Sequence, residues 1–437
     1  MKAVIMAGGK GTRISSVASD IPKPMIKIDN KPVLEHEIEC LRDQGFTDLI
    51  ITVSHLGHII MDYFGDGSKI SPATGKSFGV NIEYFVEEVP LGNAGALFKL
   101  KDKLSDDFLL LNADSIFDID FNRLVDYHLS KGGLVTLFTH PNNHPYDSGL
   151  IFVDDNMAVT SWLAKEDERP EFYRNRVNAG LHVLNKKVLD VNIDTPKIDL
   201  DRQILKPLSG TGKMFAYDSP EYVKDMGTPE RYEVVCNDFR EGRVKAKNLV
   251  NKQKAIFLDR DGTINEYVGF LRNIDDFKLI DGVEEAISKI NALGYLAIVI
   301  TNQPVIARGE VTIEELNNIH NKMETLLGKE GAFIDRIYYC PHHPDKGFDG
   351  EVAELKIDCN CRKPKTGLID QAVADFNIDL NKSIIIGDST LDIMTGKNAL
   401  IKTCLVKTGI KGEDKKYDVK PDIVADTLLD AINSVLY

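Results

Sequence analysis

Short apolar runs recur along the chain, and most of them end in glycine, acidic or small polar residues. Residues 2–6, 109–111, 255–258, 296–300 and 383–386 are such runs. Runs of this length, bounded by turn-forming residues, predict buried β-strands. Polar side chains that can carry chemistry follow several of them, so the pattern places candidate sites at strand ends.

Helical periodicity separates the strands of the second half. Residues 283–293 have apolar side chains at helical spacing, and Gly294 follows as a stop. Residues 312–327 predict a second helix, which begins with a capping box completed by Glu315. We interpret His320 on this helix as structural. Alternating strands and helices predict a doubly wound parallel sheet with its active residues at the carboxyl ends of the strands.

The chain is too long for one ordinary hydrophobic core. Its 437 residues predict two doubly wound α/β domains, at residues 1–235 and 255–437, joined by a polar linker at residues 236–254. The composition is globular, with 43% hydrophobic and 27% charged residues, and a net charge of -14 without a basic stripe argues against a nucleic-acid partner. No apolar run approaches the ~20 residues of a membrane span, so we expect a cytoplasmic protein with no membrane partner.

A glycine-rich turn follows the first predicted strand. Glycines in such a turn let backbone N–H groups close around phosphate oxygens. The turn contains Gly8, Gly9, Gly11, Thr12 and Arg13. Lys23 follows between two prolines, which stiffen the backbone on either side of its charge and suit a phosphate clamp. From these residues alone, a structural turn and a solvated lysine stay open as alternatives.

Together these segments resemble the signature of the sugar-1-phosphate nucleotidyltransferases, and the similarity continues through the first half, closest to heptose-1-phosphate guanylyltransferases. In that family a sugar-phosphate oxygen attacks the α-phosphorus of a nucleoside triphosphate, and pyrophosphate leaves. The resemblance implies that Arg13 and Lys23 hold the triphosphate and that Asp114 and Asp225 hold Mg²⁺. Further implied contacts are Gly92 and Asn93 with the nucleotide base, Asn178 and Gly180 with the sugar, and Lys165 with the sugar's phosphate.

Some positions depart from this family's pattern. Asn93 stands where the family usually has Thr, Ala113 where it has Gly, and Ala164 where it has an acid that contacts the sugar. Residues 139–148 contain histidines and prolines without helix or strand spacing. We interpret them as a loop beside the sugar pocket, with an ordinary surface loop as the alternative, rather than as a metal cluster.

Two carboxylates follow the strand at residues 255–258. Asp259 and Asp261 are two residues apart, so at a strand end they face the same side, and Gly262 allows the chain to turn. Other polar residues follow in order along this half: Thr301, Asn302, Gln303, Lys363 and Asp388. This ordered set resembles the haloacid dehalogenase-like (HAD-like) phosphatases.

The resemblance implies a role for each of these residues. Asp259 is the expected nucleophile, which forms an aspartyl phosphate. Asp261 is the expected acid, which protonates the leaving alcohol and then activates water. The remaining implied contacts are Thr301, Asn302 and Lys363 with the phosphoryl group, and Asp259, Asp388 and the backbone carbonyl of Asp261 with Mg²⁺.

Thiols and imidazoles crowd the segment before Lys363. Cys340, Cys359 and Cys361 lie near His342 and His343. In a cytoplasmic chain this favours a metal over disulfides, and three thiolates with one imidazole form a closed, structural Zn²⁺ site. The segment resembles the histidinol-phosphate and heptose-1,7-bisphosphate phosphatases, and the resemblance favours His342 as the imidazole ligand. The resemblance also implies that Arg308 contacts the substrate's second phosphate and that Arg362 and Lys363 lie at the rim of the site. Ser389 departs from the pattern, because the family often has a basic residue at this position.

The two halves predict consecutive reactions. We expect the second to remove the 7-phosphate of D-glycero-D-manno-heptose 1,7-bisphosphate and the first to join the heptose 1-phosphate to a nucleotide, with GTP as donor. The expected cofactors are Mg²⁺ in both domains and structural Zn²⁺ in the second; a homo-oligomer is left open. One alternative is a mannose-1-phosphate-type transferase fused to a histidinol-phosphate-type phosphatase. Another is an inactive transferase-like module that regulates an active phosphatase.

Overall fold

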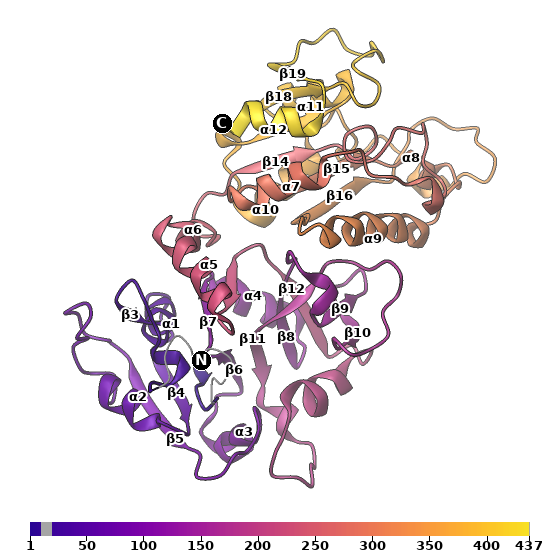
Figure 1. Cartoon of the computed structure of the whole chain (residues 1–437). Coiled ribbons are helices and arrows are strands. Elements are labelled where there is room, and N and C mark those ends of the chain that lie inside the picture. Colours follow the sequence, from indigo (N-terminus) through magenta and orange to yellow (C-terminus); the bar gives the residue numbers. More distant parts are fainter. Residues whose placement is uncertain (10–19, 437) are drawn as a thin grey trace. The chain divides into compact units, whose positions relative to one another are not determined.

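The computed structural model describes residues 1–9 and 20–436, which form two compact units (Figure 1). The first unit consists of Met1–His140, Ile151–Trp162 and Asn178–Asn248, and the second of Pro141–Leu150, Leu163–Val177 and Leu249–Tyr437. Two segments of the first half of the sequence therefore group with the second unit. The residue-level boundaries of the two catalytic domains stay a prediction.

A mixed sheet forms the centre of the first unit. Its strands and those of two small ribbons are β1 (Lys2–Met6), β2 (Lys27–Ile28), β3 (Lys31–Pro32), β4 (Asp48–Val53), β5 (Asn81–Val86), β6 (Asp107–Asn112), β7 (Ser115–Asp118), β8 (Val135–His140), β9 (Leu150–Val153), β10 (Val159–Leu163), β11 (Val177–Asn185), β12 (Met214–Asp218) and β13 (Tyr222–Asp225). The sheet order is β10-β9-β11-β6-β1-β4-β5, and β8 pairs with β11 and β12. Strands β6, β1, β4 and β5 are parallel, as predicted, whereas β11 runs antiparallel to β6.

Helices cover both faces of this sheet. They are α1 (Val33–Arg42), α2 (Gly57–Phe64), α3 (Gly95–Leu100) and α4 (Phe121–Lys131), and the unit also contains α5 (Pro229–Arg240) and α6 (Arg243–Ala246). Ile5 and Leu111 pack in one core with α1, α2 and α4, whereas Val4 and Leu110 pack in another with α3. Successive strand side chains point to opposite faces, so the apolar runs are buried on both sides.

The second unit is built on a parallel sheet with the order β16-β15-β14-β17-β18-β19. Its elements are β14 (Ala255–Leu258), β15 (Leu296–Asn302), β16 (Arg336–Cys340), β17 (Ile384–Gly387), β18 (Lys402–Val406), β19 (Ile423–Ala425), α7 (Val283–Ala292), α8 (Pro304–Ala307), α9 (Ile313–Lys329), α10 (Gly367–Phe376), α11 (Thr390–Asn398) and α12 (Leu428–Leu436). Helices α7, α9 and α12 share one core with Ile256 and Leu258, and α10 shares the opposite core with Ala255 and Phe257. The predicted doubly wound α/β class is confirmed.

The local predictions also hold. Helix α9 begins with the predicted capping box, in which Thr312 Oγ1 accepts from Glu315 N (3.1 Å) and Glu315 Oε2 accepts from Thr312 N (2.7 Å). Within the described residues, no helix has the length and apolar character needed to cross a membrane.

Candidate active sites

The first unit has a cavity of about 630 Å³ at the carboxyl ends of β1, β4 and β6. This is where ligands bind in open α/β sheets. The predicted site residues that line it are Gly8, Gly9, Lys23, Gly92, Asn93 and Asp114. The predictions for Gly11, Thr12 and Arg13 fall outside the described residues.

Lys23 and Asp114 form an ion pair in this cavity. Lys23 Nζ lies 2.8 Å from Asp114 Oδ2, and the lysine side chain is only 8% exposed. Prolines on both sides fix the backbone of Lys23. A buried ammonium needs such a partner to keep its charge. The pair places a cation that could bind phosphate oxygens beside a carboxylate that could hold a divalent metal.

A backbone hydrogen bond holds the segment of Asp225 beside Asp114. The N–H of Met226 donates to the carbonyl oxygen of Asp114 (3.1 Å). The carboxylate of Asp225 accepts from Gly227 N (2.8 Å) and from Arg231 Nη1 (2.6 Å). The described residues that line the cavity include Gly227 but not Asp225. Its role as a magnesium ligand therefore stays a prediction.

The predicted base loop is held against a neighbouring backbone. Gly92 has φ +79°, and a Cβ added there would lie 2.3 Å from the carbonyl oxygen of Ile198. Only glycine fits this position. Asn93 Oδ1 accepts from Leu200 N (2.7 Å). The Asn93 side chain therefore fixes the loop to the backbone of Leu200.

The predicted sugar and sugar-phosphate contacts belong to different units. Gly180 has φ +75°, and an added Cβ would lie 2.7 Å from Nδ2 of Asn112, which lines the cavity. Asn178 Oδ1 accepts from Gly180 N (3.1 Å), so this turn adjoins a cavity residue. Lys165 belongs to the second unit; its side chain is exposed, and its Nζ lies 3.8 Å from Asp147 Oδ2.

Sequence reasoning missed one acid near the first site. Glu37 on α1 is fully buried, and neither of its carboxylate oxygens has a hydrogen-bond partner in the described part of the chain. Burial, and secondly the charge of Asp114, raises the pKa of Glu37 well above its usual value. The sequence contains a signal that could have identified Glu37. It comes three residues after Leu34 and four before Leu41, so helical spacing places it on the apolar face of the helix.

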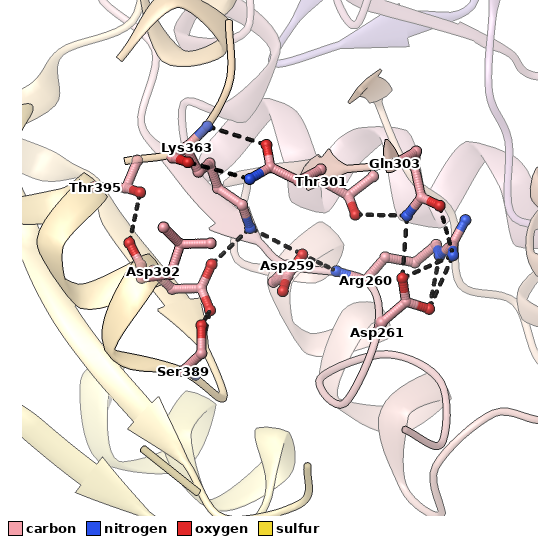
Figure 2. Close-up of polar contacts among 11 residues, drawn as sticks. Asp259, Arg260, Asp261, Thr301, Gln303, Lys363, Ser389, Asp392 and Thr395 are labelled. Carbon is pink, nitrogen blue, oxygen red and sulfur yellow. Dashed lines mark hydrogen bonds and ion pairs between the residues drawn. The ribbon is translucent and has the colours of Figure 1, made fainter. Parts of the chain in front are cut away.

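A smaller cavity of about 140 Å³ lies at the carboxyl ends of β14, β15 and β17 in the second unit. Figure 2 shows Lys363 between Asp259 and Asp392. Lys363 Nζ lies 2.9 Å from Asp259 Oδ1 and 2.6 Å from Asp392 Oδ1. The sequence prediction had not included Asp392. The sequence signal that could have identified it is the capping-box spacing of Ser389 and Asp392. In the structure, Asp392 Oδ2 accepts from Ser389 N (3.2 Å) and from Ser389 Oγ (2.5 Å).

Asp259, Asp388 and Asp392 form a group of carboxylates that can hold a metal ion. Burial raises the pKa of Asp259 to about 6, opposed by the charge of Lys363, and burial with the charge of Asp259 raises that of Asp388 to about 8. An added Cβ at Gly262 would lie 2.3 Å from Asp388 Oδ2, and one at Gly409 would lie 2.0 Å from it. Buried acids crowded in this way retain protons unless a cation neutralises them, and oxygen ligands suit Mg²⁺.

The carboxylate of Asp261 also lines this cavity and is held by several N–H donors. Asn265 Nδ2 donates to Oδ1 (3.1 Å), and Gln303 Nε2 donates to Oδ2 (3.0 Å). The neighbouring Arg260 adds its guanidinium (Figure 2). Gln303 Nε2 also donates to Thr301 Oγ1 (2.9 Å), which connects the predicted acid with the predicted phosphoryl contact.

Asn302 and Lys363 bind each other through the backbone of Lys363. Asn302 Oδ1 accepts from Lys363 N (3.0 Å), and Asn302 Nδ2 donates to Lys363 O (3.2 Å). The Asn302 amide thus positions the lysine, although it also lines the cavity.

The guanidinium of Arg308 is packed between two aromatic rings. It lies 4.2 Å from the ring centroid of Phe270 and 4.4 Å from that of Phe348. The described residues that line the cavity do not include Arg308, whereas three other cations, Arg362, Lys363 and Lys416, do line it. The structure therefore does not place Arg308 at the expected position for a second phosphate.

The four predicted zinc ligands meet in one cluster. Sγ of Cys361 lies 3.3 Å from that of Cys340, 3.2 Å from that of Cys359 and 3.2 Å from Nδ1 of His342. A tetrahedral ion with Zn–S bonds of about 2.3 Å separates its thiolates by about 3.8 Å, so a small expansion accommodates Zn²⁺. His343 instead places its Nε2 3.4 Å from Arg308 Nη2. The donor set fits a structural zinc site with His342 as the imidazole ligand.

Removing one donor of this cluster tests the zinc assignment. We expect Cys361→Ser to reduce bound zinc from about one equivalent per chain to near zero, and to lower the unfolding temperature of the second unit by roughly 10 °C, because structural zinc contributes folding free energy directly. Metal analysis and thermal unfolding measure the two effects. Cys236→Ser, outside the cluster, is the control. Unchanged zinc content in Cys361→Ser contradicts the assignment.

Comparisons with known proteins agree with this two-part organisation. A nucleotidyl transferase family model matches residues 2–240, and a HAD-hydrolase-like model matches residues 360–431. The D-glycero-beta-D-manno-heptose-1,7-bisphosphate 7-phosphatase of Pasteurella multocida is 46% identical over 158 residues, which are 36% of this chain and 83% of the relative. The mannose-1-phosphate guanyltransferase of Saccharomyces cerevisiae is 31% identical over 258 residues, which are 58% of this chain and 67% of the relative.

Among solved structures, HddC from Yersinia pseudotuberculosis is 27% identical with a TM-score of 0.45, and the match covers 55% of this chain and 99% of that one. The family models and the curated relatives divide the chain into the same two kinds of enzyme. The chain therefore belongs to the nucleotidyl transferase family through its first half and to the HAD-like phosphatases through its second, and it is an enzyme with both activities.

Proposed function

We propose that the second half removes the 7-phosphate from D-glycero-D-manno-heptose 1,7-bisphosphate, and that the first half then transfers GMP from GTP to the heptose 1-phosphate. The observation that carries this proposal is the presence in one chain of a phosphatase site and a nucleotidyl-transfer cavity, because the product of the first reaction is the acceptor of the second. We take residues 1–235 and 255–437 as the two catalytic domains, joined by residues 236–254.

The names of the relatives support the choice of substrates. The relatives of the second half act on a heptose 1,7-bisphosphate, and 83% of one such relative is covered at 46% identity. The relatives of the first half use mannose 1-phosphate and a guanylyl group. A manno-configured heptose 1-phosphate keeps the ring configuration of mannose 1-phosphate, so one transferase architecture suits both sugars.

In the phosphatase reaction, Asp259 attacks the 7-phosphorus and becomes an aspartyl phosphate. Asp261, oriented by its N–H donors, gives a proton to the departing heptose oxygen and later takes one from the attacking water. Lys363 binds the transferred phosphoryl oxygens after its pairs with Asp259 and Asp392 rearrange. Asp259 and Asp388, with the backbone carbonyl of Asp261, hold Mg²⁺, which supplies positive charge against phosphate repulsion.

In the transfer reaction, the cavity residues orient the triphosphate and the sugar phosphate for in-line attack. Lys23 binds phosphate oxygens, and the fixed loop at Gly92 and Asn93 receives the base. Asp114, with Asp225, provides carboxylate oxygens for Mg²⁺, which supplies charge to the leaving pyrophosphate. The contribution of these residues is positioning and electrostatic stabilisation rather than acid–base chemistry.

A product assay tests the proposal. Purified protein is incubated with Mg²⁺ and a panel of sugar phosphates with GTP or ATP. We expect D-glycero-D-manno-heptose 1,7-bisphosphate with GTP to give inorganic phosphate first, and then pyrophosphate and a GDP-heptose. Heptose 1-phosphate supplied directly should give the sugar nucleotide without the phosphate.

The panel also decides against the alternatives. Faster release of phosphate from histidinol phosphate than from the heptose bisphosphate would reject the substrate of the second half. Phosphate release without any sugar nucleotide, for every nucleotide and sugar offered, would show that the first half is a binding module.

A further inference from the structure

The carboxylate of Asp261 is held by a fully buried guanidinium. Arg260 is 0% exposed, its Nη2 lies 2.8 Å from both oxygens of Asp261, and its Nε lies 3.2 Å from Oδ1. The planar fork of an arginine fixes the plane of the carboxylate that it binds. The direction in which Asp261 presents its oxygens therefore depends on how Arg260 is held.

His320 on α9 holds the far side of this guanidinium. Arg260 Nη1 donates to His320 Nε2 (3.2 Å), and His320 is 6% exposed. Burial, then the charges of Arg260 and Arg174, lowers the pKa of His320 well below its usual value, so the ring is neutral and Nε2 accepts. His320 therefore gives Arg260 a directional anchor, which an apolar side chain of similar size lacks.

The next turn of α9 binds the backbone of a segment that comes from the first half of the sequence. Thr325 Oγ1 accepts from Tyr173 N (2.8 Å) and donates to Tyr173 O (3.0 Å). Glu324 Oε2 accepts from Asn175 N (2.6 Å). Both side chains are buried. Helix α9 therefore meets a peptide backbone through buried polar side chains, one turn from His320.

Two further contacts extend this face of α9. An added Cβ at Gly328 would lie 2.6 Å from Cγ of Pro145, so the segment before β9 packs against the helix at a position that only glycine leaves open. Lys322 Nζ lies 5.5 Å from the ring centroid of Phe172. These contacts come from Pro141–Leu150 and Leu163–Val177, the two segments of the first half that group with the second unit.

We propose that Arg260 and His320 are positioning residues for the acid Asp261, and that residues 172–175 of the transferase half complete the phosphatase site by fixing α9. This assignment rests on the proposed phosphatase function. It means that a segment of the transferase half supports the active site of the phosphatase half. The phosphatase half then uses a segment that comes from the other half of the sequence.

Two esters with different leaving groups test the role of His320. The heptose bisphosphate has an alkyl leaving group that needs a proton from Asp261, whereas p-nitrophenolate departs without one. The value of kcat/KM reports the steps up to leaving-group release. We expect His320→Leu to lower kcat/KM about 30-fold for the bisphosphate but less than about 3-fold for p-nitrophenyl phosphate, since loss of general acid catalysis affects only the first ester.

His320→Gln is the conservative variant, because its amide oxygen can accept from Arg260, and it should restore most of the loss. Asn318→Ala, at an exposed position of the same helix, is the matched control and should leave both esters unaffected. Equal losses on both esters, or none, in His320→Leu would overturn the positioning role. Absence of Asp259-dependent hydrolysis of both esters in the wild-type chain would instead reject the phosphatase function itself.

Glu324 tests the contribution of the segment. Glu324→Ala removes the acceptor for Asn175 N, and we expect the same preferential loss on the bisphosphate, about 3- to 10-fold. Glu324→Gln retains an acceptor oxygen and should stay within about 2-fold of the wild type. If Glu324→Ala behaves like Glu324→Gln while His320→Leu shows its loss, residues 172–175 play no part in the phosphatase.

Discussion

Replacing Asp259 by Asn should abolish phosphate release from the heptose bisphosphate, with a loss of at least about 10⁴-fold in kcat. The amide cannot attack phosphorus, and it removes one carboxylate from the group that can hold Mg²⁺. It also deprives Lys363 of a partner, but Asp392 remains 2.6 Å from the ammonium, so the buried lysine keeps an opposite charge. The measurement is steady-state phosphate release.

Several properties of the Asp259→Asn variant should stay unchanged. Zinc content should be retained, because the four zinc donors do not include Asp259. Pyrophosphate release from supplied heptose 1-phosphate and GTP should also be retained. Asp349→Asn, an exposed carboxylate-to-amide change in the same half, is the matched control and should leave phosphate release intact. Residual phosphatase activity above one per cent of the wild type would exclude Asp259 as the nucleophile.

Replacing Asp114 by Ala should suppress sugar-nucleotide formation by about 10³-fold and leave the phosphatase unaffected. The change removes the carboxylate that pairs with Lys23 across 2.8 Å, so it costs both a proposed metal ligand and the charge that balances a buried ammonium. The measurement is pyrophosphate release with heptose 1-phosphate and GTP, at several Mg²⁺ concentrations.

Asp126→Ala is the matched control for this change, because Asp126 is an exposed acid on α4 in the same unit. Phosphate release from the bisphosphate by Asp114→Ala should equal that of the wild type. Full transferase activity in Asp114→Ala would mean that magnesium is held elsewhere, and parallel loss of both activities would indicate misfolding rather than a lost ligand.

Much of the fold and the position of both sites could be predicted from local sequence pattern. A strand is a short apolar run, and the one or two residues after it lie at the carboxyl end of the sheet, so Asp114, Asp259 and Asp388 were located by counting along the chain. Cys359 and Cys361 are also found by spacing, because they are separated by one residue, whereas His342 was chosen over His343 from the family resemblance. Each of these signals lies within a few residues of sequence.

Other features depend on which side chains a folded chain brings together. The pair between Lys363 and Asp392 joins residues 29 positions apart, on a loop and a helix. Arg308 has the positive charge expected of a phosphate contact, yet its guanidinium is packed between the rings of Phe270 and Phe348. No periodic pattern encodes such contacts, since they follow from how loops and helices pack on the sheet.

The sequence by itself determined the two α/β halves and the strand ends that carry the acids, because each is a short-range pattern, whereas the choice of His342 in the Cys/His cluster depended on the family resemblance. Only the tertiary structure decided that Arg260 binds the carboxylate of Asp261 and that His320 on α9 accepts a hydrogen bond from that guanidinium. It also decided that residues 172–175 attach to that helix rather than to the half that surrounds them in sequence. The Arg260–His320 and Tyr173–Thr325 hydrogen bonds join residues 60 and 152 positions apart, so they form only when helices and loops pack. Once these groups are buried, leaving one without its partner costs free energy, which favours this arrangement.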